Sequence, residues 1–192
     1  MSKSLLHLIV MKDNLAWNEE SRRTVFSCPI FTVGERFCRS PDNNLRTYTV
    51  LDTSDWAIVI PIVETERGRE FVMVRQWRHG AREMSLEFPG GVFEKGESAE
   101  AAAARELREE TGCVAGKIEK LGTFSPNPAI MSNRVHFFLA LDLKPPLEQE
   151  LDDDEYVEVE NVPWEEVLRG LGKPPYIHAL MGTAMALYLA KR

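Results

Sequence analysis

Three glutamates are concentrated in one short stretch of the sequence, "RELREETG" at residues 105–112. Glu106, Glu109 and Glu110 are three and one positions apart along the chain, so a helix would place them on one face or next to it. Like charges at such spacings destabilise a helix. A solvated helix face is the ordinary explanation of an acidic cluster. The alternative is a site for a divalent cation, because magnesium prefers carboxylate oxygens as ligands.

The residues around this cluster decide between the two explanations. Gly91 is followed after five residues by Glu97, and after seven more by the run that starts at Arg105 and ends at Gly112. This pattern resembles the signature box of the Nudix hydrolases at every defining position over residues 91–113. The resemblance implies a loop, helix and loop that present carboxylates to magnesium ions bound to a nucleoside diphosphate group.

By this resemblance the metal ligands are carboxylates that we expect on an exposed helix face, together with one backbone carbonyl. The candidates are Glu106, Glu110, Glu109 and the carbonyl of Gly90. Glu109 can instead pair with Arg105, four residues earlier. Glu97 is expected to support the loop or to reach the metal through water. Mg²⁺ is the implied cofactor, and Mn²⁺ is a possible substitute.

The flanking segments narrow the resemblance to one subgroup. "VRQWRHGAREMSLEFPGG" (74–91) resembles ADP-ribose pyrophosphatases and related nucleoside diphosphate sugar hydrolases. There the position of Arg78 contacts a phosphate, which the donor fork of a guanidinium suits. Glu87 is expected either to bind the substrate ribose or to brace the site. Pro128, sixteen residues after Gly112, is typical of the same subgroup and is a substrate-binding candidate.

A second acidic run, "LEQELDDDEYVEV" (147–159), is most simply a solvated loop. In the related pyrophosphatases, a loop at this place carries an acidic residue that acts as the base or binds a further metal. Glu155 matches best, and Asp153 and Asp154 are its rivals. The resemblance therefore gives Glu155, Glu109 and Arg105 as candidate catalytic residues.

The remaining elements follow from local patterns. Strands are predicted at 5–11, 23–37, 46–52, 56–64, 69–77, 117–124, 134–143 and 155–162. A helix is predicted over 99–112, with Ser98 at its start and Gly112 at its end. Further helices follow Pro163 and cover 176–192. The expected fold is α/β: a Nudix-type α/β/α sandwich with a mixed sheet (56–192), plus a small antiparallel β-rich N-terminal lobe (1–55).

By resemblance, the N-terminal lobe forms a homodimer by exchanging strands and helps to hold the nucleobase. Arg46 is the substrate-binding candidate in this lobe. Aromatic residues that could stack on a base are Trp17, Phe31, Phe37 and Tyr48.

Composition limits the other possibilities. The net charge of −7 argues against nucleic-acid and anionic-membrane partners. Three scattered cysteines without metal-ligand spacing favour free thiols in a reducing cytoplasm. The apolar run at 5–11 is too short to span a membrane.

The predicted function is magnesium-dependent hydrolysis of ADP-ribose or a similar nucleoside diphosphate sugar to a nucleoside monophosphate and a sugar phosphate. One alternative is a hydrolase of GDP-mannose or another nucleotide sugar. Another is a non-catalytic nucleotide-sugar sensor on the same fold, which an intact box disfavours. An RNA-cap hydrolase is disfavoured because the sequence has no basic patch interleaved with aromatic residues.

Overall fold

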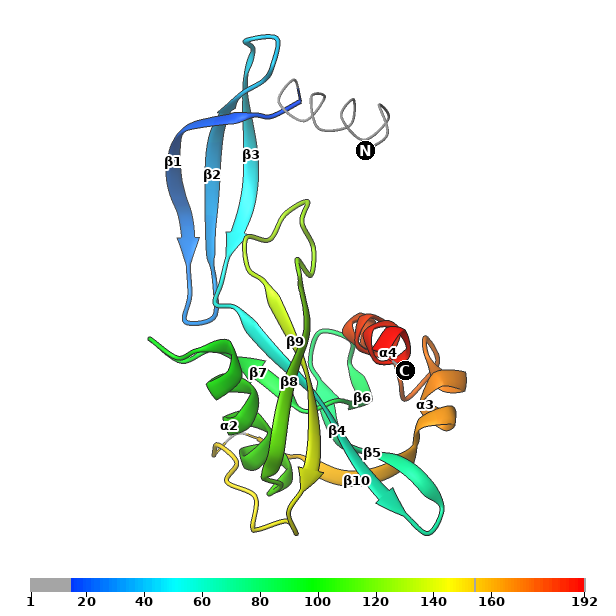
Figure 1. Ribbon diagram of the computed structural model, residues 1–192. Helices are drawn as coiled ribbons and strands as arrows, with labels where there is room; N and C mark the ends of the chain where they lie inside the picture. The colour runs from blue at the N-terminus through cyan, green and yellow to red at the C-terminus, as the bar shows by residue number, and fades with distance from the viewer. Residues whose placement is uncertain (1–14, 154, 192) are drawn as a thin grey trace, which may run out of the picture. The chain divides into compact units, whose positions relative to one another are not determined.

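The computed structural model describes residues 15–153 and 155–191 (Figure 1). The chain forms two compact units. The first contains the described residues up to Ser54 together with Asn127–Asn133, and the second contains Asp55–Pro126 and the described residues from Arg134 onward. The strand predicted at 5–11 lies outside the described residues.

The first unit is a three-stranded antiparallel sheet, as expected for the N-terminal lobe. Its strands β1 (Asn18–Ser27), β2 (Thr32–Arg39) and β3 (Leu45–Asp52) lie in sequence order. The stretch 23–37, expected as one strand, is divided by a turn in which the Cys28 N–H donates to the Phe31 carbonyl at 3.0 Å. Residues 127–133 are tied to β3, because the Leu51 N–H donates to the Ile130 carbonyl at 2.7 Å.

The second unit is built on a seven-stranded mixed sheet. Its strands are β4 (Trp56–Thr65), β5 (Gly68–Arg78), β6 (Glu83–Glu87), β7 (Gly90–Val92), β8 (Ala115–Phe124), β9 (Val135–Leu143) and β10 (Glu158–Pro163). The main order is β10-β5-β4-β9-β8, with β6 beside β5 and β7 beside β4. Only the β4–β9 pair among these is parallel, and the antiparallel pair of β4 and β5 comes from the strands predicted at 56–64 and 69–77.

Helices cover both faces of this sheet, as Figure 1 shows. Alternate residues of a strand point to opposite faces, and on β5 Phe71 and Val72 enter two different cores. Helix α2 (Ala99–Thr111) packs on the Val72 side. Helices α3 (Trp164–Gly170) and α4 (Ala179–Lys191) contribute to the core on the Phe71 side. The expected α/β/α sandwich with a mixed sheet is therefore confirmed.

The C-terminal helix begins later than predicted, at Ala179 rather than at residue 176. Met181 and Ala184 of this helix are buried in the core, while Ile177 precedes the helix. Within the described part of the chain, no helix is long and apolar enough to cross a membrane.

Candidate active site

Helix α2 begins and ends at the two residues that the sequence predicts. The Ser98 hydroxyl accepts a hydrogen bond from the Ala101 N–H at 3.2 Å. Gly112 is left-handed, with φ of 69°, and its N–H donates to the Arg108 carbonyl. A Cβ at Gly112 would lie 2.1 Å from the Leu147 carbonyl oxygen. This position therefore needs glycine both for its backbone angle and for the chain that passes beside it.

The carboxylates of Glu106 and Glu110 lie on the buried side of α2. The two residues are 8% and 4% exposed, and they share this side with Ala103 and Leu107 of the core. The expectation of an exposed carboxylate face is therefore wrong. Glutamate is rarely buried without a partner, so burying two of them one helical turn apart needs a physical compensation.

Strand β7 provides the surface against which these carboxylates lie. The Gly90 N–H donates to Glu110 Oε2 at 2.9 Å. A Cβ at Gly91 would lie 2.6 Å from Glu106 Oε1, and one at Gly90 would lie 2.2 Å from the Ala57 carbonyl oxygen. Because neither glycine has a Cβ, β7 can lie close to both β4 and the glutamates. This close approach explains why the signature box has a glycine at position 91.

The electrostatics of this pair are unfavourable for two negative charges. Burial, reinforced by the charges of Glu106 and Glu155, raises the pKa of Glu110 to about 8, although the Gly90 hydrogen bond opposes the shift. Burial also raises the pKa of Glu106 to about 7, against the effect of Arg105. A nearby positive charge would relieve the cost of ionising both groups.

Arg105 pairs with three glutamates of the box, one of which is Glu106. Its guanidinium pairs with Glu97 at 3.0 Å, with Glu106 at 2.8 Å and with Glu109 at 2.9 Å. The Glu97 carboxylate also accepts from the Glu94 N–H and closes the loop before α2. The Arg105–Glu109 pair, one of the two roles expected for Glu109, is present, and Glu97 supports the loop. A metal-binding role for either carboxylate stays a prediction.

Arg78 and Glu87 form a fork-to-fork pair across β5 and β6. Arg78 Nε and Nη2 donate to the two oxygens of Glu87 at 2.9 and 2.6 Å. Burial raises the pKa of Glu87, but Arg78, together with His178 and Ser85, outweighs this, and the net pKa is lowered. Glu87 therefore braces Arg78. The Arg78 side chain keeps 38% of its surface exposed, against 5% for Glu87, so the guanidinium is still accessible to a ligand.

Arg78 lies where cavities meet. One cavity of about 260 Å³ extends from Arg78 and Glu87 to Gly90 and Gly91. Another, of about 280 Å³, has Arg78 and Glu155 in its wall. Arg78 therefore lines both the cavity that reaches Gly90 and the cavity that reaches Glu155.

The acidic segment, defined by the described residues 151–153 and 155–157, brings Glu155 to this place. The charge of Glu155 contributes to the pKa shifts of Glu106, Glu110 and Arg78. Its carboxylate accepts from the Asp152 N–H at 3.2 Å, and the residue is exposed. Asp153 is exposed in the same turn, and Asp154 lies outside the described residues. The choice of Glu155 over its rivals stays a prediction.

The donors around Glu106 and Glu110 suit a divalent cation. Within residues 15–153 and 155–191, no group of three or more His, Cys, Asp or Glu side chains is placed to hold a metal ion. Glu106 and Glu110, however, are two hard oxygen donors whose burial and mutual repulsion a cation would compensate. Magnesium keeps several ligands from water or phosphate, so two carboxylates and a backbone oxygen fit it.

Two predicted substrate-binding residues, Arg46 and Pro128, belong to the first unit. Arg46 is exposed on β3, and its guanidinium donates to the Leu45 carbonyl. Pro128 is exposed in the segment tied to β3. Among the base-stacking candidates, Trp17 and Tyr48 form an edge-to-face pair with ring centroids 5.3 Å apart. The roles of these residues stay predictions.

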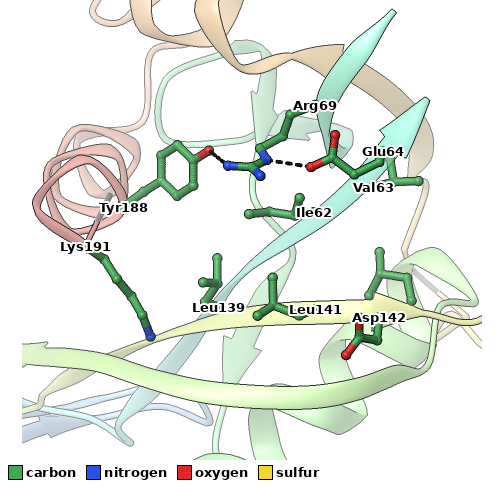
Figure 2. Close-up of a pocket in the computed structure, with 10 residues that line it drawn as sticks. Ile62, Val63, Glu64, Arg69, Leu139, Leu141, Asp142, Tyr188 and Lys191 are labelled. Atoms are coloured by element: carbon green, nitrogen blue, oxygen red, sulfur yellow. Dashed lines mark hydrogen bonds and ion pairs between the residues drawn. The ribbon is translucent and has the colours of Figure 1, made fainter. Parts of the chain in front are cut away.

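A larger cavity, of about 570 Å³, lies elsewhere in the second unit, between the β4–β5 hairpin, β9 and α4 (Figure 2). Figure 2 shows the Arg69 guanidinium between the Tyr188 hydroxyl and the Glu64 carboxylate, with hydrogen bonds to both. Unlike Arg78, Arg69 lies among Ile62, Leu139 and Leu141 and beside no candidate metal ligand. This cavity is separate from the candidate site.

Sequence reasoning missed two residues of the site. His178 accepts a hydrogen bond from the Leu180 N–H and also lines the cavity beside Arg78. Burial lowers the pKa of His178. Gln149 donates to the Glu110 carbonyl. An isolated histidine or glutamine carries no periodic signal, so neither could be found from the sequence.

Comparisons with known proteins agree with this geometry. Residues 54–181 match the model of the NUDIX domain. The ADP-ribose pyrophosphatase of Bacillus subtilis (strain 168) is 41% identical over 112 residues, or 58% of this chain and 60% of that protein. The ADP compounds hydrolase NudE of Escherichia coli (strain K12) is 31% identical over 107 residues, or 56% of this chain and 54% of that protein.

A solved structure described as "Crystal structure of ADP compounds hydrolase" superposes with a TM-score of 0.81 at 25% identity, covering 94% of this chain and 96% of that one. The two curated relatives, in contrast, are matched over less than two thirds of their own length.

Proposed function

The chain belongs to the NUDIX family, and on that premise we propose that it is a metal-dependent pyrophosphohydrolase of ADP-ribose or a similar nucleoside diphosphate sugar. The observation that carries the proposal is the buried Glu106–Glu110 pair next to the accessible guanidinium of Arg78. Relatives described as ADP-ribose pyrophosphatase and ADP compounds hydrolase support the substrate class.

In this proposal the metal is held by Glu106, Glu110 and the Gly90 carbonyl, with Glu109 as a further ligand or as the partner of Arg105. A bound divalent cation supplies positive charge that neutralises the diphosphate and polarises water. We assign Mg²⁺ to this site, with Mn²⁺ as a substitute. An acidic protein can bind an anion in this way, because the local field differs from the net charge.

The side chains of the chain supply the other steps. Arg78, held in plane by Glu87, binds phosphate oxygens through its donor fork. Glu155 takes a proton from the attacking water as general base. The water oxygen bonds to one phosphorus while the bridging P–O bond breaks. The products are a nucleoside monophosphate and a sugar phosphate.

We propose further that the N-terminal lobe, residues 1–55, forms a homodimer and helps to bind the base, while residues 56–192 form the catalytic domain. Val25, Phe26 and Ile30 are exposed in this lobe, and a second copy of the chain would cover apolar surface of this kind.

The negative net charge favours a small-molecule substrate over nucleic acid or membrane. Three free cysteines fit a cytoplasmic location.

The test is release of phosphate, in an assay coupled to a phosphatase, from ADP-ribose, GDP-mannose, UDP-glucose and diadenosine polyphosphates. We expect preferential cleavage of ADP-ribose with Mg²⁺ or Mn²⁺ and no cleavage with chelator. A preference for GDP-mannose would retain the chemistry and change the substrate. Inactivity on the whole panel with both metals would contradict the proposal that the protein is an enzyme and favour a nucleotide-sugar sensor.

A further inference from the structure

Residues 144–150, here called the strap, cross the C-terminal end of α2. The Leu147 N–H donates to the Gly112 carbonyl at 2.8 Å, and the Glu150 N–H donates to the Glu109 carbonyl at 3.0 Å. The last carbonyls of a helix lack donors within the helix, and here the strap supplies donors to them. The strap leads directly into the acidic segment that carries Glu155.

Gln149 connects the two parts of the site. Its side-chain Nε2 donates to the Glu110 carbonyl at 2.5 Å and to the Val157 carbonyl at 3.4 Å. One amide thus joins the backbone of a candidate metal ligand to the backbone two residues after Glu155. Both ends of the acidic segment are thereby held at the end of α2.

Close packing holds the strap at Leu147, whose backbone lies against Gly112, but the strap also borders a cavity of about 790 Å³. The strap itself lines this cavity, opposite apolar side chains such as Val72, Cys113 and Val159. A surface that faces a void loses the dispersion contacts that hold tightly packed segments in place. The hydrogen bonds of Leu147, Gln149 and Glu150 therefore help to fix where the strap lies.

Glu155 lies in the wall of the same cavity as Arg78, whose guanidinium attracts its carboxylate, and it accepts a hydrogen bond from the Asp152 N–H. The exposed Arg108–Glu150 ion pair adds little, because solvent screens it.

We propose that Gln149 is a positioning residue that holds the acidic segment, and with it Glu155, beside Arg78 and the Glu106–Glu110 pair. The inference deepens the proposed function and rests on it for the role of Glu155. Gln149 touches neither substrate nor metal in this account. It acts through the backbone of Glu110 and Val157.

The test compares Gln149→Leu, which keeps the size of the side chain but removes the amide, with Glu148→Ala, a change at an exposed neighbour in the strap. Hydrogen exchange of peptides covering 147–157 is measured without substrate. We expect about tenfold faster exchange in Gln149→Leu and little change in Glu148→Ala, consistent with the loss of one hydrogen-bonding group. Unchanged exchange in Gln149→Leu would overturn the proposal.

Steady-state kinetics in a double-mutant cycle then show whether Gln149 acts by positioning Glu155 or by supporting the fold in general. Gln149→Leu is expected to lower kcat about tenfold with little change in KM, and to have no further effect on kcat when Glu155 is already glutamine. An equal loss of kcat in both backgrounds would overturn the positioning role. If the wild type hydrolyses no substrate of the panel, the proposed function fails. Faster exchange in Gln149→Leu would still support the inference that Gln149 holds the acidic segment.

Discussion

The two acidic regions of the site differ in how their carboxylates are held. Glu106 and Glu110 are buried on α2, fixed by helix packing and by the glycines of β7, and their pKa values are raised. Glu155 is exposed in an irregular segment and is held through hydrogen bonds of the strap. The first region has a fixed geometry at an electrostatic cost, as a cation site requires. The second is accessible and less constrained, as suits a group that exchanges protons.

Glu110→Gln is expected to show the largest effect on activity. It removes a candidate metal ligand, so kcat should fall by about a thousandfold. Because Glu110 is costly to ionise when buried, the variant should be at least as stable as the wild type at pH 8 with chelator. Thermal unfolding measures the stability, and the coupled assay measures kcat. Glu100→Gln, in the first turn of α2, is the control; near-normal activity of Glu110→Gln would contradict the metal assignment.

Glu155→Gln is expected to be the next most severe change. The loss of a general base lowers kcat by about a hundredfold, while the melting temperature should stay the same because the side chain is exposed. The pH profile of kcat supplies an independent check, since the limb due to the base should disappear. If the same loss appeared only in Asp153→Asn, the base would be that neighbour instead.

Arg78→Ala affects both binding and stability. Loss of the phosphate contact should raise KM by about tenfold. The variant also leaves Glu87 buried without its partner, which costs on the order of 2 kcal/mol after allowance for the partial exposure of Arg78. Denaturant unfolding measures this cost. Arg75→Ala, on the same strand but paired with Glu160, is the matched control. Unchanged KM in Arg78→Ala would exclude the phosphate contact.

The stability of the metal-free protein should also depend on pH. The pKa of Glu110 is raised from 4.5 to about 8 and that of Glu106 to about 7. An acid whose pKa is higher in the folded state contributes stability below its unfolded value, and this contribution is lost as pH rises through the folded value. Without metal, stability should therefore fall between pH 4.5 and 8. Melting curves with chelator and with Mg²⁺ should diverge as pH rises; parallel curves would contradict this.

The sequence was sufficient to predict several of the regular elements, although the stretch 23–37 was expected as one strand and the C-terminal helix begins three residues later than predicted. Ser98 and Gly112 carry local capping chemistry, so both ends of α2 could be predicted. The spacing of the box identified Glu106 and Glu110 together. The apolar, β-branched runs at 56–64 and 69–77 predicted β4 and β5, and the resemblance to the Nudix hydrolases implied a sheet between layers of helices.

The environment of those residues could not be predicted in the same way. A glutamate-rich helix indicates an exposed face, and the burial of Glu110 depends on Gly90, twenty residues earlier, packing against α2. The strap has no periodic pattern, and its link from Gln149 to Glu110 joins residues 39 positions apart. Contacts of this range depend on the tertiary fold rather than on local sequence preference.

The most direct test of the cation site is calorimetric titration of Mn²⁺ into the metal-free protein at pH 8, without substrate. Wild type and Glu100→Gln are predicted to bind the metal with the same affinity, while a Glu106→Gln/Glu110→Gln double variant that remains folded should bind at least a hundredfold more weakly, on the order expected for the loss of charged ligands. Equal affinity in all three proteins would contradict the account and place the metal elsewhere.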